Sequence, residues 1–118
     1  MKILIVDDSK AMRMIVTRTL RQADLGEFSL VEASNGVEAL ERVASDQPDL
    51  VLTDWNMPLM GGLELLQALR GLNLQVGVVT SEGTVEMRQA AAAAGAKFVI
   101  TKPFTAETFR AAIAAVLR

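Results

Sequence analysis

The sequence predicts an α/β fold in which a doubly wound parallel sheet of five strands carries five helices on its two faces. Short apolar runs alternate along the 118 residues with longer segments of helical period, which is typical of this class. The central run, Leu50-Val51-Leu52, has no polar interruption, as expected for a strand buried on both faces. No linker, repeat or low-complexity tract divides the chain, so we expect one domain over residues 1–118.

The expected strands are short runs bounded by turn-forming residues. Their approximate ranges are 3–6, 28–33, 49–54, 75–80 and 97–101. Most are rich in Val, Ile and Leu, the residues that fill buried strands. The third run ends in Asp54, and Pro58 makes the following segment leave the strand as a loop.

The expected helices are segments whose apolar residues fall on one face. The first runs from Ser9 to about Gln22, and the others follow the strands at about 36, 62, 84 and 105. Ser9, Thr84 and Thr105 are suitable N-caps, because their side-chain oxygens accept hydrogen bonds from the first turn. Gly95 is suited to end the alanine-rich fourth helix. The last helix has apolar residues at helical spacing: Phe109, Ala112, Ile113, Val116 and Leu117.

The composition excludes several kinds of site. The chain has no Cys and no His, so thiolate metal sites, disulfides and histidine general bases are absent. Any metal must be a hard cation bound by oxygen. Twelve basic and 14 acidic residues give a net charge of −2, which offers no electrostatic case for direct nucleic-acid binding. No apolar run approaches the roughly 20 residues of a membrane span, and acids follow the first strand where an export signal would continue. We therefore expect a cytoplasmic protein.

Polar residues gather at the carboxyl ends of the expected strands. Asp7 and Asp8 follow the first strand, Asp54 the third, Thr80 the fourth and Lys102 the fifth. In a parallel sheet these ends open on one edge, where the ligands of open α/β sheets bind. The sequence therefore predicts that the five side chains form one site.

Each of these residues has an ordinary structural explanation when taken alone. Asp7 and Asp8 would complement a helix N-terminus, Asp54 would form a turn, Thr80 would be a strand residue and Lys102 a solvated lysine. Together they are harder to explain, because three crowded carboxylates repel one another. Lys102 and a divalent cation would relieve the repulsion, and Mg²⁺ suits the site best because it takes a few carboxylates and keeps several waters.

The same arrangement predicts phosphoryl transfer. An Asp carboxylate is a nucleophile able to form an aspartyl-phosphate, and Asp54 needs no general base because it is already ionised. Lys102 would bind a phosphoryl oxygen as a point charge, and Thr80 would donate its hydroxyl to another. Asp7, Asp8 and Asp54 would hold the Mg²⁺.

Four motifs together carry a family resemblance that spans essentially the whole chain. They are Val6-Asp7-Asp8-Ser9, Thr53-Asp54-Trp55-Asn56-Met57-Pro58, Val79-Thr80-Ser81-Glu82 and Thr101-Lys102-Pro103-Phe104. In their order and spacing the chain resembles the receiver domain of two-component response regulators, and among them the chemotaxis regulators. The resemblance implies a flavodoxin-like fold with strand order 2-1-3-4-5.

The resemblance also implies a mechanism. Asp54 would take a phosphoryl group from a sensor histidine kinase, and Mg²⁺ would be bound by Asp7, Asp8, Asp54 and the backbone carbonyl of Asn56. The protein would be a signalling switch and not an enzyme acting on a substrate. Its output partner would bind the surface of the fourth helix, fifth strand and fifth helix. A cis peptide before Pro103 is implied as well.

Five positions can be compared with the family pattern. The aromatic residue that the family usually has three positions before the lysine is Val99 here, and the neighbouring Phe98 should point to the opposite face of the sheet. The sequence therefore has no aromatic side chain at the position of the family's switch residue. Asn56 and Glu82 stand where the family tunes the lifetime of the phosphoryl group, and they suggest a short one. Gly61-Gly62 replaces a common Asp-Gly and should give a flexible loop.

Other functions remain open at this stage. The chain would fit the receiver part of a larger regulator with a DNA-binding or enzymatic output domain, or a phosphate sink without a dedicated partner. Phosphatases of the haloacid dehalogenase class also use a nucleophilic Asp and Mg²⁺. They usually need an Asp-x-Asp motif on the first strand and a longer chain, and Asp54-Trp55-Asn56 does not provide that motif.

Overall fold

The computed structural model describes residues 1–116, which form five parallel strands and five helices in strict alternation. The strands are β1 (Lys2–Val6), β2 (Ser29–Ala33), β3 (Leu50–Thr53), β4 (Gln75–Thr80) and β5 (Phe98–Thr101). The helices are α1 (Lys10–Gln22), α2 (Gly36–Asp46), α3 (Gly62–Leu69), α4 (Val85–Ala93) and α5 (Ala106–Val116). The strand order is β2-β1-β3-β4-β5, which confirms the expected fold.

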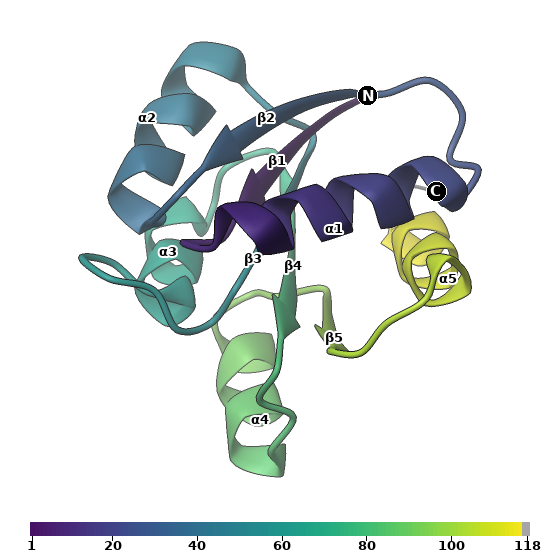
Figure 1. Ribbon diagram of the computed structural model, residues 1–118. Helices are drawn as coiled ribbons and strands as arrows, with labels where there is room; N and C mark the ends of the chain where they lie inside the picture. The colour runs from purple at the N-terminus through teal and green to yellow at the C-terminus, as the bar shows by residue number, and fades with distance from the viewer. Residues whose placement is uncertain (117–118) are drawn as a thin grey trace.

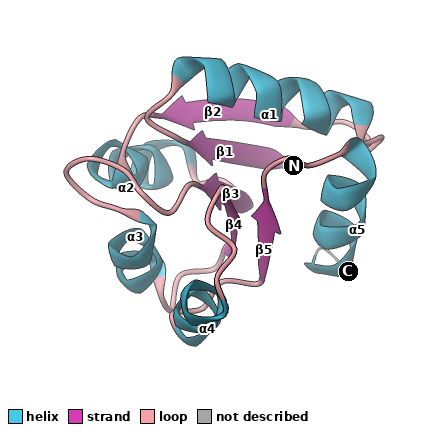
Figure 2. Ribbon diagram, turned by 60° about the horizontal axis from the view of Figure 1, so that its bottom comes forward, coloured by secondary structure: helices cyan, strands magenta, loops and turns pink. Residues whose placement is uncertain are grey.

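The sheet lies between two layers of helices (Figures 1 and 2). Leu4 and Val6 of β1 belong to the hydrophobic cluster that includes residues of α2, α3 and α4. Ile3 and Ile5 belong to the other cluster, together with residues of α1 and α5. This alternation of side chains explains why the inner strands read as continuous apolar runs, since both faces are covered.

The helix starts follow the predicted caps. The side chains of Ser9, Thr84 and Thr105 each accept a hydrogen bond from the N–H three residues further on, at 3.1 to 3.2 Å. Asn35 caps α2 in the same way. Gly95, which follows the C-cap residue Ala94 of α4, has a φ of +109°, the conformation for which glycine is favoured. Leu117, expected on the last helix, lies outside the described residues.

The glycine pair expected in a flexible loop stands at the start of α3, with Gly61 as the N-cap and Gly62 as the first helical residue. The N–H of Gly62 donates to the carbonyl of Trp55 at 2.8 Å. A Cβ atom on Gly62 would lie 2.5 Å from the carbonyl oxygen of Asp54, so this position has room only for glycine. The pair therefore lets the start of α3 pack directly against the chain that follows β3.

Neighbouring residues of β5 face opposite sides of the sheet, as the strand period predicts. Val99 packs against the cluster under α2, α3 and α4, whereas Phe98 packs against the cluster under α1 and α5. The ring of Phe98 covers Gly77 of β4, where a Cβ atom would collide with it. Phe98 is thus a core residue under α1 and α5. Val99, three positions before Lys102, lies on the opposite face of the sheet.

Among the helices of residues 1–116, we find none with the length and apolar character needed to cross a lipid bilayer.

Candidate functional site

An acidic cluster lies at the carboxyl edge of the sheet. Asp7 and Asp8 follow β1 and Asp54 follows β3, because β1 and β3 are paired with Val6 beside Thr53. Each of the three carboxylates has an oxygen within 4.8 Å of an oxygen of the others. Asp7 is buried, Asp54 is partly buried and Asp8 is exposed. The predicted meeting of these three side chains is therefore present, with one open side.

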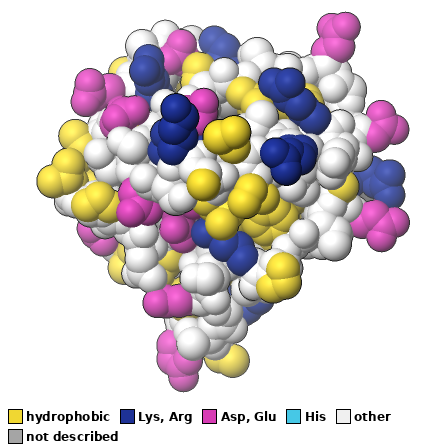
Figure 3. All heavy atoms as spheres, viewed as in Figure 1, with side chains coloured by type: hydrophobic (Ala, Val, Ile, Leu, Met, Phe, Trp, Pro, Cys, Tyr) yellow, Lys and Arg dark blue, Asp and Glu magenta, His cyan; other side chains and the backbone are white. Residues whose placement is uncertain are grey.

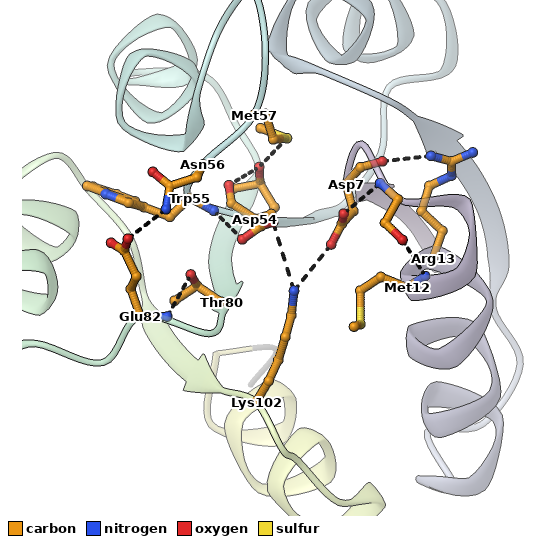
Figure 4. A network of polar contacts seen from close by, with 12 residues as sticks. Asp7, Met12, Arg13, Asp54, Trp55, Asn56, Met57, Thr80, Glu82 and Lys102 are labelled. Carbon is orange, nitrogen blue, oxygen red and sulfur yellow. Dashed lines mark hydrogen bonds and ion pairs between the residues drawn. The ribbon is translucent and has the colours of Figure 1, made fainter.

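Asp7 is held at three of its atoms. Its N–H donates to the carbonyl of Ala33 at the end of β2, at 3.1 Å. Its Oδ1 accepts a hydrogen bond from the N–H of Ser9 at 2.9 Å. Its carbonyl oxygen accepts one from the guanidinium of Arg13 at 2.7 Å. The carboxylate is thereby oriented, and its Oδ2 points toward Lys102 (Figure 4).

Lys102 reaches the cluster from the end of β5. Its Nζ lies 3.5 Å from Oδ2 of Asp7 and 3.9 Å from Oδ2 of Asp54. The backbone N–H of Lys102 donates to the carbonyl of Thr80, and the following bond to Pro103 is cis, as expected. One ammonium group thus stands between two carboxylates, which offsets part of their mutual repulsion.

The pKa of Asp54 is raised above its ordinary value. Burial is the main cause, because it penalises the charged form, and the negative charge of Asp7 adds to it. The N–H of Trp55, which donates to Oδ1 at 2.7 Å, and the charge of Lys102 act in the opposite direction. A cation bound among these carboxylates would further favour the ionised form.

Of the remaining predicted residues, Asn56 and Glu82 form the rim of the site, whereas Thr80 lies inside it at the end of β4. Thr80 is fully buried, and its hydroxyl accepts a hydrogen bond from the N–H of Glu82 at 3.2 Å. The side-chain amide of Asn56 donates to Oε1 of Glu82 at 2.8 Å. This bond joins the loop after β3 to the loop after β4 (Figure 4). Both side chains are exposed, so the rim faces solvent.

The donor set fits a hard divalent cation. It consists of the carboxylate oxygens of Asp7, Asp8 and Asp54, and the whole sequence has no imidazole or thiolate. Oxygen donors on one open side of a rigid sheet suit Mg²⁺, which keeps several water ligands. The nearby lysine leaves the group with a formal charge of −2, which a divalent cation would balance.

A family model for the response regulator receiver domain matches residues 3–114. The chain belongs to the response regulator receiver family. The fold class, the strand order and the resemblance inferred from the motifs are thereby confirmed. It is a signalling domain of the two-component type and not a conventional enzyme.

Relatives of this receiver include chemotaxis proteins. The chain is 43% identical to the chemotaxis protein CheY of Pseudomonas aeruginosa over 114 residues, covering 93% of this chain and 90% of the relative. It is 45% identical to CheY-3 of Vibrio cholerae, covering 93% and 86%. The structure of V. cholerae CheY4 superimposes with a TM-score of 0.86 at 33% identity, over 98% of both chains. This receiver is therefore similar to CheY proteins in sequence and in fold.

Two contacts of the receiver site were not foreseen from the sequence. Ser9 was predicted only as a helix cap, but its N–H also orients the carboxylate of Asp7. Arg13 was not singled out, although its guanidinium binds the backbone of Asp7. Ser9 could have been found, because an Asp two residues before a cap commonly forms a local turn. Arg13 carries no such signal, since its contact depends on how α1 packs on the sheet.

Proposed function

We propose that this receiver is a phosphorylation-controlled switch whose phosphoryl acceptor is Asp54. The observation that carries the proposal is the group of three carboxylates within 4.8 Å, with the ammonium of Lys102 between Asp7 and Asp54. A cluster of like charges is costly unless it binds something of opposite charge. We infer that residues 1–118 act as one receiver domain, with a sensor histidine kinase as the donor.

The residues around the acceptor fit Mg²⁺. Asp7, Asp8, Asp54 and the backbone carbonyl of Asn56 would hold the ion, in agreement with the oxygen-only donor set. When bound, Mg²⁺ supplies positive charge that offsets the negative charge on the transferring phosphoryl group. Ser9 and Arg13 keep Asp7 in place for this purpose.

The chain's own residues account for the transfer. A carboxylate oxygen of Asp54 attacks the phosphorus of the donor, the P–N bond of the phosphohistidine breaks, and its electron pair stays on the imidazole nitrogen. The attacking form is the ionised carboxylate, which the Trp55 N–H and the charge of Lys102 favour and which burial and the charge of Asp7 disfavour. A cation held by these carboxylates would favour the ionised form. Lys102 then binds one phosphoryl oxygen, and the Thr80 hydroxyl donates to another.

Phosphorylation would bias the receiver between two conformations. Thr80 is followed by the loop that carries Glu82, so its movement toward the phosphoryl group would shift this loop and the start of α4. Val99 has no ring to swing, and we therefore assign the coupling to loop movement. The output partner would bind at α4, β5 and α5. The similarity to chemotaxis proteins supports a chemotaxis-type pathway in the cytoplasm.

The test uses Trp55, the single tryptophan, which follows Asp54 directly. Mg²⁺ is titrated first, then acetyl phosphate or beryllofluoride is added, and fluorescence is followed. We expect saturable changes in the wild type and no response to the phosphodonor in Asp54→Asn. Asp24→Asn is the matched control, because it removes the same charge at an exposed position with a φ of +55° that Asn tolerates. An equal phosphodonor response in Asp54→Asn would overturn the assignment.

A further inference from the structure

Arg13 links the acidic cluster to the edge strand of the sheet. It lies in the second turn of α1, and its Nη1 donates to the carbonyl oxygen of Asp7 at 2.7 Å. Its Nε donates to Oε1 of Glu32 on β2 at 2.9 Å. Long side chains on a helix point back toward its N-terminus, which explains how Arg13 reaches a residue six positions earlier. One guanidinium therefore joins the segment that follows β1 to strand β2.

The contact with Asp7 is at the peptide group that joins Asp7 to Asp8. The N–H of Asp7 is already fixed by the carbonyl of Ala33, so holding the Asp7 carbonyl fixes the plane of the next peptide. The orientation of that peptide plane sets the direction in which the side chain of Asp8 points from the backbone. Asp8 is exposed, unlike the buried Asp7, and its place in the acidic group depends on the backbone that carries it.

The ion pair between Arg13 and Glu32 has little weight as a stabilising contact in itself. The Glu32 side chain is 53% exposed, and such pairs contribute little to folding. The Arg13 side chain is only 15% exposed, and its guanidinium keeps a fork of donors in one plane. Glu32 therefore serves to hold that plane while the other nitrogen binds Asp7.

We propose that Arg13, held in place by Glu32, is a positioning residue for the cation ligands Asp7 and Asp8. This inference rests on the proposed Mg²⁺ site. The proposed positioning role and the charge of Arg13 predict opposite changes in Mg²⁺ affinity when Arg13 is replaced. Arg13 is a cation near a cation site, so removing its charge should strengthen Mg²⁺ binding if charge were its only effect. If it positions the ligands, its removal weakens binding, as is usual for residues that orient metal ligands.

The experiment compares Mg²⁺ affinities in full-length variants by Trp55 fluorescence, with the Mg²⁺-dependent rise in melting temperature as a second readout. We expect Arg13→Met to bind Mg²⁺ about tenfold more weakly than wild type. Arg13→Lys keeps the charge but lacks the fork, and should also bind more weakly. Arg18→Met is the matched control, because Arg18 is an exposed arginine of the same helix. Lys and Arg side chains lie in the open on the face of the molecule that Figure 3 shows. Arg18→Met should leave the affinity unchanged or slightly higher.

A double-mutant cycle tests the part played by Glu32. Glu32→Ala should weaken Mg²⁺ binding when Arg13 is present and have no effect in the Arg13→Met background. Equal effects in both backgrounds would overturn the role of Glu32.

Wild-type or tighter binding by both Arg13 variants would overturn the positioning role but leave the proposed function standing. A wild type without any Mg²⁺ response would overturn both. Urea unfolding checks that each variant is folded. If Arg13→Met is not folded, the Mg²⁺ affinity of Arg13→Lys decides between the outcomes.

Discussion

Asn56 and Glu82 join the two loops at the mouth of the acidic cluster, with Nδ2 of Asn56 donating to Oε1 of Glu82 at 2.8 Å. The bond holds the negative charge of Glu82 beside Asn56, which lies two positions after the proposed phosphoryl acceptor Asp54. Glutamine at position 82 would keep an acceptor for the Asn56 amide and remove only the charge. The pair therefore allows the charge at the rim to be tested separately from the hydrogen bond.

Glu82→Gln should react faster with small anionic phosphodonors. Removing one negative charge near the acceptor should raise the rate with acetyl phosphate about twofold at low salt. The gain should disappear well above about 0.1 M ionic strength, because exposed charges are screened. The rate is followed by Trp55 fluorescence, and Glu41→Gln on α2 is an exposed control. A gain that persists in high salt would point away from an electrostatic cause.

Lys102→Ala should weaken both the fold and the switch. Without the ammonium, the carboxylates of Asp7 and Asp54 lose their counter-charge, and we expect the free energy of unfolding to fall by about 1–2 kcal/mol without divalent cations. Mg²⁺ should reduce this deficit. The variant should still accept phosphate slowly but couple poorly to its output partner.

Urea unfolding with and without Mg²⁺ measures the effect of Lys102 on stability, and Lys97→Ala is the control because Lys97 is an exposed lysine just before β5. Undiminished partner binding by phosphorylated Lys102→Ala would show that the lysine does not carry the signal. If Mg²⁺ did not reduce the loss of stability, the ion would not be binding the Asp7 and Asp54 carboxylates that Lys102 contacts.

Asp54→Asn should stabilise the cation-free protein at neutral pH. Burial raises the pKa of Asp54 in the folded state, so the folded chain binds more protons than the unfolded chain between the two pKa values. The cost of ionising Asp54 therefore grows as pH rises through that window and is complete above the folded pKa. The advantage of Asn should be largest near pH 7 and shrink as pH falls.

Unfolding free energies at several pH values, measured in a chelator, check the pH dependence of Asp54→Asn. Asp24→Asn should show no comparable pH-dependent advantage, since Asp24 is exposed. A stabilisation by Asp54→Asn that grows toward acid pH would contradict the direction of the pKa shift.

Leu59→Asn should stabilise the protein. Leu59 has a φ of +68° and its surface is 84% exposed, so it occupies a left-handed conformation that is unfavourable for Leu and buries little. Asn visits this conformation more readily, and we expect a gain of about 0.5–1 kcal/mol. Leu72→Asn replaces another exposed leucine, one for which no positive φ is found, and should gain nothing. Urea midpoints at equal slope provide the comparison, and equal changes in both variants would exclude backbone strain as the cause.

Gly77→Ala should destabilise the sheet by about 1–3 kcal/mol, because its Cβ atom would collide with the ring of Phe98. Phe98→Leu should be less costly in the Gly77→Ala background than in the wild type, since the ring is the obstacle. The double-mutant cycle is measured by urea unfolding. Additive effects would mean that the loss arises elsewhere than at this contact.

Much of the fold and of the candidate site follows from local pattern. The caps Ser9, Thr84 and Thr105 were predicted correctly because a cap is satisfied by N–H groups three residues away. The cluster of Asp7, Asp8 and Asp54 was predicted because parallel strands bring their carboxyl ends to one edge. The close approach of Gly62 to the backbone of Asp54 was not predicted, because it depends on how α3 packs against the chain after β3.

By itself the sequence determined the alternation of strands and helices, their approximate limits, and which residues stand at the strand ends. These properties depend on residues close together in the chain, where period and capping act. Only the tertiary structure decided the contact of Arg13 with the Asp7 carbonyl, the reach of Lys102 to two carboxylates, and the raised pKa of Asp54. Each of these depends on helix packing, strand order and burial, which bring together residues from separate elements and exclude water around them.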